Sequence, residues 1–179
     1  MTADWVTAHV NVADVSCVDA QWLHILVGVP AHGRALARYL TAEGTTARVI
    51  RGHKSRTTDR FFDEIGAVLQ FPDHFGENWA ALADCIEDMS WLPADAYALV
   101  VTNGDQLLAD EPERSRQVLL KILDRAATYW SADEPEGGKS WPHGSLPFHV
   151  VLQASETGVP QLTQTLSALG RTYSVLNET

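Results

Sequence analysis

Residues 73–85, which read Asp-His-Phe-Gly-Glu-Asn-Trp-Ala-Ala-Leu-Ala-Asp-Cys, contain side chains that could serve catalysis or binding. For catalysis, Cys85 beside Asp84, with His74 nearby, provides the residue types of a thiol nucleophile and its base. The alternative is a structural thiol with no catalytic role.

The same stretch could instead bind a positively charged surface. If residues 78–89 form a helix, Ala80, Asp84 and Asp88 fall four apart on one side, with Glu77 just before them. Carboxylates stacked in this way can meet arginine side chains or a phosphate-binding pocket through charge-assisted hydrogen bonds. A merely solvated acidic face remains the alternative. The opposite side of the helix has the spacing of a buried face, formed by Trp79, Leu82, Ile86 and Met89.

The loop before this helix has recognisable boundaries. Phe71-Pro72 ends a preceding helix, because the residue before proline is disfavoured in the helical region. Gly76 can adopt a backbone conformation that other residues avoid, and Asn78 can cap the next helix.

The rest of the chain predicts an α/β fold with a small, largely parallel sheet and helices packed on it. Strands are expected at 23–29, 46–51, 97–102, 148–153 and 172–176, and helices at 34–43, 57–70, 78–89, 110–126 and 160–169. The first two strands flank a helix and therefore suggest a parallel βαβ pair. Residues 1–20 alternate weakly and suit a strand or a loose arm. Asp110 and Glu113, with Pro112 between them, form a capping-box pattern.

Length and cysteine content set broad limits. A chain of 179 residues is one domain, or one domain with an appendage, and can bury roughly two-thirds of its unfolded surface without disulfides. Cys17 and Cys85 are the two cysteines, and we expect reduced thiols in a cytoplasmic protein. Neither a signal peptide nor a membrane-spanning run is apparent.

The formal charge of -10 is concentrated in the middle of the chain. Residues 1–56 contain six Lys/Arg against four Asp/Glu, residues 57–130 contain five against fourteen, and residues 131–179 contain two against five. Such a negative region repels nucleic acid and attracts basic proteins, so we expect no nucleic-acid partner. Solubility alone is the simpler explanation of the charge.

Two other signals are weak. Residues 137–140, Gly-Gly-Lys-Ser, echo a phosphate-binding loop, but that motif needs a glycine where Asp133 stands. The seven histidines show no metal-ligand spacing, and His32 and His149 suit ordinary core or surface positions. No metal and no cofactor are expected.

The residues from His74 to Cys85 resemble the core motif of the barstar family of ribonuclease inhibitors. That motif is an aromatic or His pair, Gly-Glu-Asn, a variable residue, Asp-Ala-Leu, an aromatic, and Asp-Cys. The order of elements from strand 46–51 to strand 148–153 is also similar. The resemblance implies a three-stranded parallel sheet with packed helices and an inhibitor that carries out no chemistry. It therefore implies that the chain is not an enzyme and that Cys85 is a structural thiol within the helix.

The resemblance also implies the residues that contact a ribonuclease. Asp84 matches the acid that occupies the enzyme's phosphate site, and His74 matches an aromatic that enters the cleft. Asp124 matches, less securely by one residue, a flanking acid. Trp91 matches an aromatic after the acidic helix. The complete set expected at the partner surface is Asp84, His74, Phe75, Gly76, Glu77, Asn78, Ala80, Ala83, Asp88, Trp91 and Asp124.

Two positions depart from the motif. Ala80 replaces the family's first helix acid, and Ala83 replaces its helix aromatic. Both are expected to face outward, so the fold should tolerate them. An arginine of the partner that would pair with the first acid has no counterpart here, which suggests a different ribonuclease, a weaker contact or another kind of target.

The sequence therefore predicts a barstar-like domain at 46–155, an N-terminal βαβ extension at 1–45 packed on it, and a C-terminal helix and strand at 156–179. The expected function is to occlude the active site of a small basic ribonuclease, of the guanyl-specific kind, as in an immunity protein of a toxin–antitoxin pair. The alternative is a barstar-fold interaction module that docks another protein through the extension. A small enzyme of unknown class is the third hypothesis.

Overall fold

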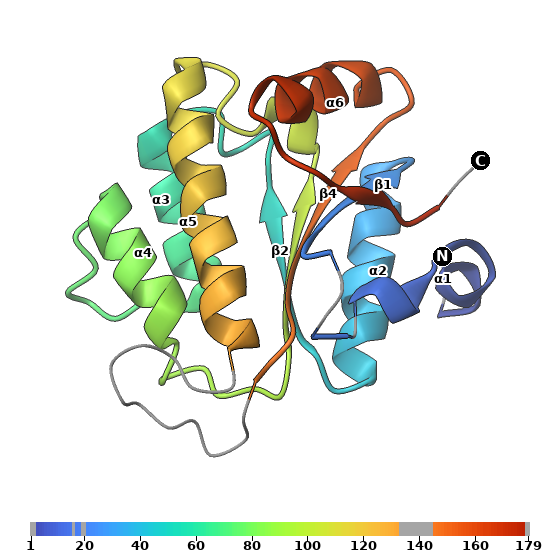
Figure 1. Ribbon diagram of the computed structural model, residues 1–179, viewed down its shortest axis with the longest axis horizontal. Coiled ribbons are helices and arrows are strands. Elements are labelled where there is room, and N and C mark those ends of the chain that lie inside the picture. Colours follow the sequence, from blue (N-terminus) through green and yellow to red (C-terminus); the bar gives the residue numbers. More distant parts are fainter. Residues whose placement is uncertain (1–2, 16, 19–20, 133–144, 178–179) are drawn as a thin grey trace.

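The computed structural model describes residues 3–15, 17–18, 21–132 and 145–177 (Figure 1). The α-helices are α1 (Ala3–His9), α2 (Pro30–Ala42), α3 (Thr58–Leu69), α4 (Trp79–Asp88), α5 (Glu113–Ser131) and α6 (Val159–Ala168). The strands are β1 (Leu23–Val27), β2 (Thr46–Arg51), β3 (Tyr97–Thr102), β4 (Phe148–Ala154) and β5 (Ser174–Val175). Two short 3-10 helices are η1 (Val12–Val15) and η2 (Gly104–Gln106). Among these described helices, none is long and apolar enough to span a membrane.

The strands form one parallel sheet in the order β2-β3-β4-β1-β5. Every residue of β3 and β4 is buried. Continuous burial is typical of central parallel strands that are covered by helices on both faces. The predicted α/β class with a largely parallel sheet is therefore confirmed.

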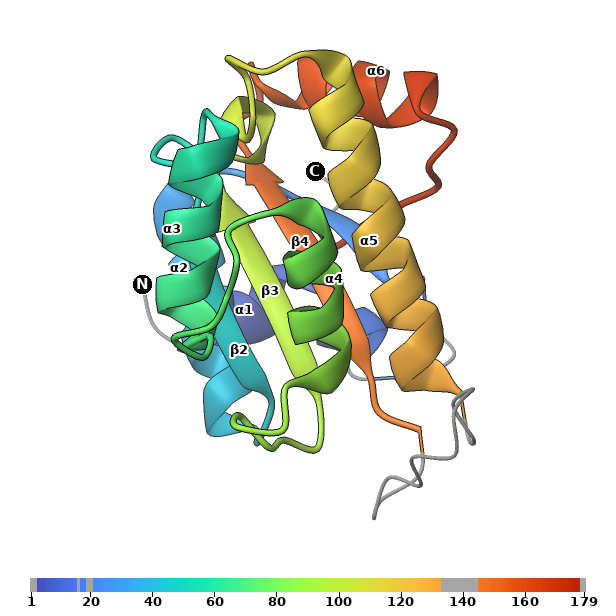
Figure 2. The ribbon, with the colours of Figure 1, turned by 90° about the vertical axis from the view of Figure 1, so that its left-hand side faces the viewer.

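The helices divide between the two faces of this sheet (Figure 1). On one face, α3, α4, α5 and α6 pack through a large apolar cluster that includes Phe61, Leu82 and Leu119. On the other face, α1 and α2 pack through a second cluster that includes Val6, Leu36 and Leu40. The α4 surface that carries the acidic residues thus lies on the face opposite the N-terminal helices (Figure 2).

The expected pairing of β1 with β2 is wrong. β1 pairs with β4 on one side and β5 on the other, so β3 and β4 separate it from β2. The connecting helix α2 packs across β2, β3 and β4 instead of linking neighbouring strands. Local sequence indicates a parallel connection, whereas long-range packing decides how many strands the crossover spans.

Residues 1–20 also differ from expectation, because α1 and η1 replace the strand or loose arm. Val6, Val10 and Val15 are buried, and this spacing suits turns of helix folded onto α2. The backbone N–H of Asn11 donates to the carbonyl of Leu176 at 3.0 Å, which ties the N-terminal segment to the C-terminal strand region.

The capping box predicted at Asp110 is wrong as well. α5 begins after Pro112 without a side-chain cap, and the Asp110 carboxylate binds the Arg56 guanidinium, with 2.8 Å from Nε to Oδ2. Glu111 instead accepts a hydrogen bond at 2.8 Å from the backbone N–H of Thr58, in the first turn of α3. A charged partner distant in sequence has displaced the local cap.

Candidate functional site

Aromatic packing holds the loop between α3 and α4 in place. Phe75 stacks edge-on against Phe62 and Phe71, with ring centroids 6.0 and 4.7 Å apart. The Trp91 indole donates to the carbonyl of Leu69 at 3.0 Å and its ring packs on Phe71. Phe75 and Trp91, both expected at the partner surface, are half-buried and anchor this loop.

The left-handed backbone in this loop belongs to Glu77, not to Gly76 as expected. Glu77 has φ 46°, a conformation that costs most residues other than glycine about 1 kcal/mol or more. Gly76 is needed for a different reason, since a Cβ there would lie 2.9 Å from Asn78 Nδ2. That nitrogen donates to the Gly76 carbonyl at 2.9 Å.

Asn78 caps α4 as predicted. Its Oδ1 accepts a hydrogen bond at 3.0 Å from the backbone N–H of Ala81, which satisfies one of the free donors in the first turn. The cap fixes where the helix begins, and the position of every later α4 side chain follows from that. α4 ends at Asp88, and Met89 adopts a left-handed conformation as its C-cap.

An outward stripe of α4 carries Ala80 and Asp84, both exposed, and ends at the half-buried Asp88. Glu77 is exposed just before the helix. Within the described part of the chain, the side chains of Asp84 and Glu77 make no hydrogen bond and no ion pair. His74 is likewise exposed in the preceding loop. Asp84 and Glu77 therefore present two carboxylates to which no hydrogen bond or ion pair is made within the described residues.

Ala83 does not face outward, and that expectation is wrong. Its side chain is 6% exposed and belongs to the cluster in which α4 packs on the sheet and on α5. The Trp130 indole of α5 donates to the Ile86 carbonyl at 2.9 Å and draws the two helices together. A side chain buried in this way is not available to a partner that covers the exposed side of α4.

The helix α5 lies beside α4 and adds a cation to the acidic surface (Figure 2). Arg125 donates through Nε to the Glu87 carboxylate, and its side chain remains 60% exposed. The pKa of Arg125 is raised, first by this hydrogen bond and also by the charges of Glu87 and Asp84. Burial and the carboxylates of Glu87 and Asp88 raise the pKa of Tyr129, one turn further along α5.

Asp124 directs its carboxylate elsewhere. It accepts hydrogen bonds from Trp22 Nε1 at 3.1 Å and from Arg171 Nη1 at 2.7 Å. These partners come from the segments before β1 and before β5. The structure thus places Asp124 where it joins both ends of the chain to α5, while its neighbour Arg125 faces α4.

Cys85 and His74 do not form a catalytic pair. No hydrogen bond joins them among the described residues, and the Cys85 side chain is 8% exposed. Burial, followed by the charges of Asp84 and Asp88, raises the pKa of the Cys85 thiol. A thiol that is harder to deprotonate is a poorer nucleophile at neutral pH. Cys17 and Cys85 are both free cysteines.

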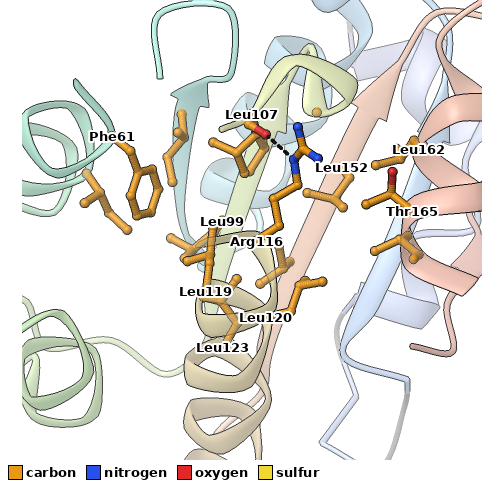
Figure 3. Close-up of a pocket in the computed structure, with 16 residues that line it drawn as sticks. Phe61, Leu99, Leu107, Arg116, Leu119, Leu120, Leu123, Leu152, Leu162 and Thr165 are labelled. Carbon is orange, nitrogen blue, oxygen red and sulfur yellow. Dashed lines mark hydrogen bonds between the residues drawn. The ribbon is translucent and has the colours of Figure 1, made fainter. Parts of the chain in front are cut away.

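A small apolar cavity lies between α5, α6 and the sheet (Figure 3). It holds about 50 Å³, and Leu119, Leu152 and Leu162 are among its walls. Arg116 donates from Nε to the Leu107 carbonyl at 3.2 Å at its edge. A space this small, lined almost wholly by aliphatic groups, suits a packing defect and not a site for a polar ligand.

Sequence reasoning missed a second phosphate-loop pattern. Residues 28–35 have the spacing Gly, four residues, Gly-Arg-Ala, and they begin in the turn after β1 and run into the first two turns of α2. The pattern thus lies between a strand and a helix, as such a motif requires, although Gly33-Arg34-Ala35 are already within the helix. Arg34 and Ala35 replace its Lys and its Ser or Thr. The strand order also reverses beside β1, and such a position often binds ligands. The glycine spacing together with the apolar run before it could have revealed this.

The protein's own side chains fill that crevice. The fully buried Gln153 amide donates to the Gly28 carbonyl at 2.6 Å and accepts from the Asn103 backbone N–H at 3.0 Å. The His32 ring lies so close to Gly28 that a Cβ there would fall 2.2 Å from Nδ1. Trp5 stacks on His32 with ring centroids 3.9 Å apart. A broader groove of about 550 Å³ opens beside this stack.

Metal chemistry finds no support in the described ranges, which contain no group of three or more potential His, Cys, Asp or Glu ligands. His149 is a buried core residue, in line with one of the two positions expected for it. His32 lies half-buried in the stack with Trp5. The Gly-Gly-Lys-Ser sequence at 137–140 lies outside the described residues.

The comparison with solved structures finds proteins named ORC or ORC2. The Aeropyrum pernix ORC2 protein in its ADPNP-ADP complexes matches with a TM-score of 0.58 at 9% identity, over 97% of this chain and 45% of that one. Two Drosophila ORC structures, one bound to AT-rich DNA and Cdc6 and one bound to DNA, have TM-scores of 0.47 and 0.48, identities of 17% and 16%, and cover 85% and 88% of this chain.

These similarities concern the fold alone. The chain spans 45% of the Aeropyrum pernix protein, 47% of the Drosophila protein bound to AT-rich DNA and Cdc6, and 83% of the Drosophila protein bound to DNA. A comparison with curated proteins finds no matching sequence.

The family comparison covers the elements that form the acidic site. Residues 45–153, more than half of the chain, match the family model described as "Barstar (barnase inhibitor)". The matched part runs from β2 through α4 and α5 into β4 and contains every element that shapes the acidic surface. Since its order of elements, its capped acidic helix and this match agree, the chain belongs to the barstar family.

Proposed function

We propose that this protein inhibits a small basic ribonuclease by covering its active site with the loop before α4 and the exposed stripe of α4. The mechanism is steric and electrostatic occlusion, and the inhibitor itself carries out no chemistry. The partner is a guanyl-specific ribonuclease, and the protein acts in the cytoplasm as an immunity protein for its own cell.

The observation that carries this proposal is the state of Asp84. Its carboxylate is exposed on a capped helix and has no hydrogen bond or ion pair within the described residues. A ribonuclease holds the RNA phosphate with cationic side chains, and a carboxylate can replace the phosphate through charge-assisted hydrogen bonds. Glu77 adds a second carboxylate that also has no partner in this part of the structure.

The formal charge of -10 supports the same conclusion through kinetics. Opposite charges on two proteins raise the rate of encounter, and salt weakens this effect. Central, well-packed contacts then decide how slowly the complex dissociates. We expect Asp84 and His74 to lie at the centre of the contact. Because residue 80 is alanine, a cation of the ribonuclease cleft opposite that position has no carboxylate to bind.

A charge reversal at position 84 tests the proposal. Wild-type protein should displace a 3′-nucleotide from the active site of a small basic guanyl-specific ribonuclease, and Asp84→Lys should fail to do so. Asp63→Lys is a matched control, because Asp63 is an exposed acid on α3 whose side chain makes no hydrogen bond or ion pair to the described residues. If Asp84→Lys still binds while the nucleotide stays in place, the contact lies elsewhere, as in docking through residues 1–45.

A further inference from the structure

The surface beside the acidic stripe is basic. Arg114, Lys121 and Arg125 are exposed on α5 at intervals of seven and four residues, which aligns them along one side of that helix. Arg114 and Lys121 have no hydrogen bond or ion pair within the described residues. α4 and α5 lie side by side, so a partner that covers α4 also meets part of this basic row (Figure 2).

Arg125 lies at the boundary between the two charges. Glu87 is three residues from Asp84 on α4 and accepts the Arg125 Nε hydrogen bond, so the guanidinium borders Asp84. Within the described ranges Glu87 is its only bonded partner, which leaves the two terminal nitrogens of the guanidinium to donate elsewhere. With 60% of the side chain exposed, these donors can reach a partner protein.

Fold stability alone gives little reason for an arginine here. An exposed ion pair contributes about 0–1 kcal/mol, because both side chains lose freedom and water screens the charges. A cation beside Asp84 also reduces the attraction between this surface and a purely basic cleft. Arg125 fits the surface best if the partner provides a carboxylate opposite it.

Ribonuclease chemistry indicates where that carboxylate lies. Cleavage of RNA needs a general base within hydrogen-bond reach of the 2′-oxygen, which is next to the phosphate. The base is a carboxylate in some ribonucleases and an imidazole in others. If Asp84 takes the phosphate site, a guanidinium bordering Asp84 falls close to the base.

We infer that Arg125 selects ribonucleases whose general base is a carboxylate, by donating hydrogen bonds to that carboxylate while Asp84 occupies the phosphate site. The inference rests on the proposed function and adds a specificity residue to it. A planar guanidinium can bind a carboxylate through two parallel hydrogen bonds, whereas a histidine base offers no negative charge to it.

A double-mutant cycle tests the inference with a guanyl-specific ribonuclease that uses a glutamate base as the probe. Calorimetry would give the Kd of wild type and of Arg125→Ala, each against the intact enzyme and against its base Glu→Gln variant. We expect Arg125→Ala to weaken binding about tenfold against the intact enzyme and less than about twofold against the variant. Arg34→Ala is the matched control, since Arg34 is exposed on the opposite face of the sheet.

Two results would overturn the inference and leave the proposed function standing. In the first, Asp84→Ala weakens binding while Arg125→Ala binds like wild type. In the second, Arg125→Ala weakens binding equally against both enzymes, which would assign Arg125 the role of positioning Glu87. If wild type binds neither enzyme, the proposed function fails and this inference fails with it.

Discussion

The imidazole rings of His24 and His149 are hydrogen-bonded inside the sheet, with 2.9 Å between His24 Nε2 and His149 Nδ1. The pair joins β1, which lies outside the family match, to β4, which lies within it. His149 Nε2 lies 3.1 Å from the Cys17 carbonyl, and His24 Nδ1 lies 2.7 Å from the Ser174 hydroxyl. Two neutral rings satisfy all three contacts. His149 Nε2 donates to the Cys17 carbonyl, His24 Nε2 donates to His149 Nδ1, and the Ser174 hydroxyl donates to His24 Nδ1.

This pair makes stability depend on pH. Burial and then the His149 ring lower the pKa of His24 to about 3, and burial lowers that of His149 against the opposing effects of Cys17, Gln21 and Asp14. Below the ordinary histidine pKa, these two histidines bind protons in the unfolded chain but remain neutral in the folded protein. The free energy of unfolding therefore decreases as the pH is lowered. His24 contributes roughly 2 kcal/mol to this decrease between about pH 7.5 and about pH 5.

Urea denaturation at the two pH values measures this effect. His24→Asn should reduce the difference between them, while His53→Asn, on an exposed turn, should preserve it. Equal wild-type stability at both values would contradict the assignment of two buried neutral rings.

Replacing Glu77 should affect stability and binding in opposite directions. Its φ of 46° favours glycine, so Glu77→Gly should raise the free energy of unfolding by about 1 kcal/mol or less. The same change removes an exposed carboxylate and should weaken ribonuclease binding. Glu77→Gln retains the backbone strain and serves as the comparison. A Gly variant that binds as tightly as wild type would show that the Glu77 carboxylate does not contact the enzyme.

Asp124 should matter for stability and not for inhibition. Asp124→Ala removes the acceptor for Trp22 and Arg171 and should cost about 1 kcal/mol, because the site is half-exposed and water screens the ion pair. Thermal denaturation and an inhibition assay together separate the two roles, with Asp63→Ala as an exposed control. Loss of inhibition at unchanged stability would restore Asp124 to the partner surface.

Removing residues 1–45 should unfold the barstar domain. The α2 helix covers β2, β3 and β4, and burial of Leu36 and Leu40 alone contributes roughly 3–6 kcal/mol. Without it, Val100 and Val151 would face water on one side of the sheet, and β4 would lose its partner β1. A chain that starts at residue 46 should show no cooperative thermal transition. A soluble, cooperatively folding fragment would contradict this dependence.

The sequence alone was sufficient for features that local patterns control. The apolar runs predict the strands at 97–102 and 148–153. Asn78 is predictable as the cap of α4 because it is a polar residue that precedes an apolar helical repeat. Asp84 was placed on the exposed side of that helix from its spacing alone.

Features that depend on distant contacts could not be predicted in this way. Asp110 is bound by Arg56, 54 residues earlier, and Ala83 is buried within the apolar cluster that α4 shares with the sheet and the other helices of this face. The separation of β1 from β2 follows from where α2 packs, which no local pattern encodes. Glu77, and not Gly76, adopts the left-handed conformation, whereas the lack of a side chain at Gly76 leaves space for Asn78.

Titration of ribonuclease activity with this protein tests the central claim most directly. Wild type should abolish RNA cleavage by a small basic guanyl-specific ribonuclease of the same organism at one molecule per enzyme. Asp84→Ala should need a much higher concentration, while Asp63→Ala should match wild type. Equal inhibition by wild type and Asp84→Ala, or no inhibition by wild type, would contradict occlusion through Asp84.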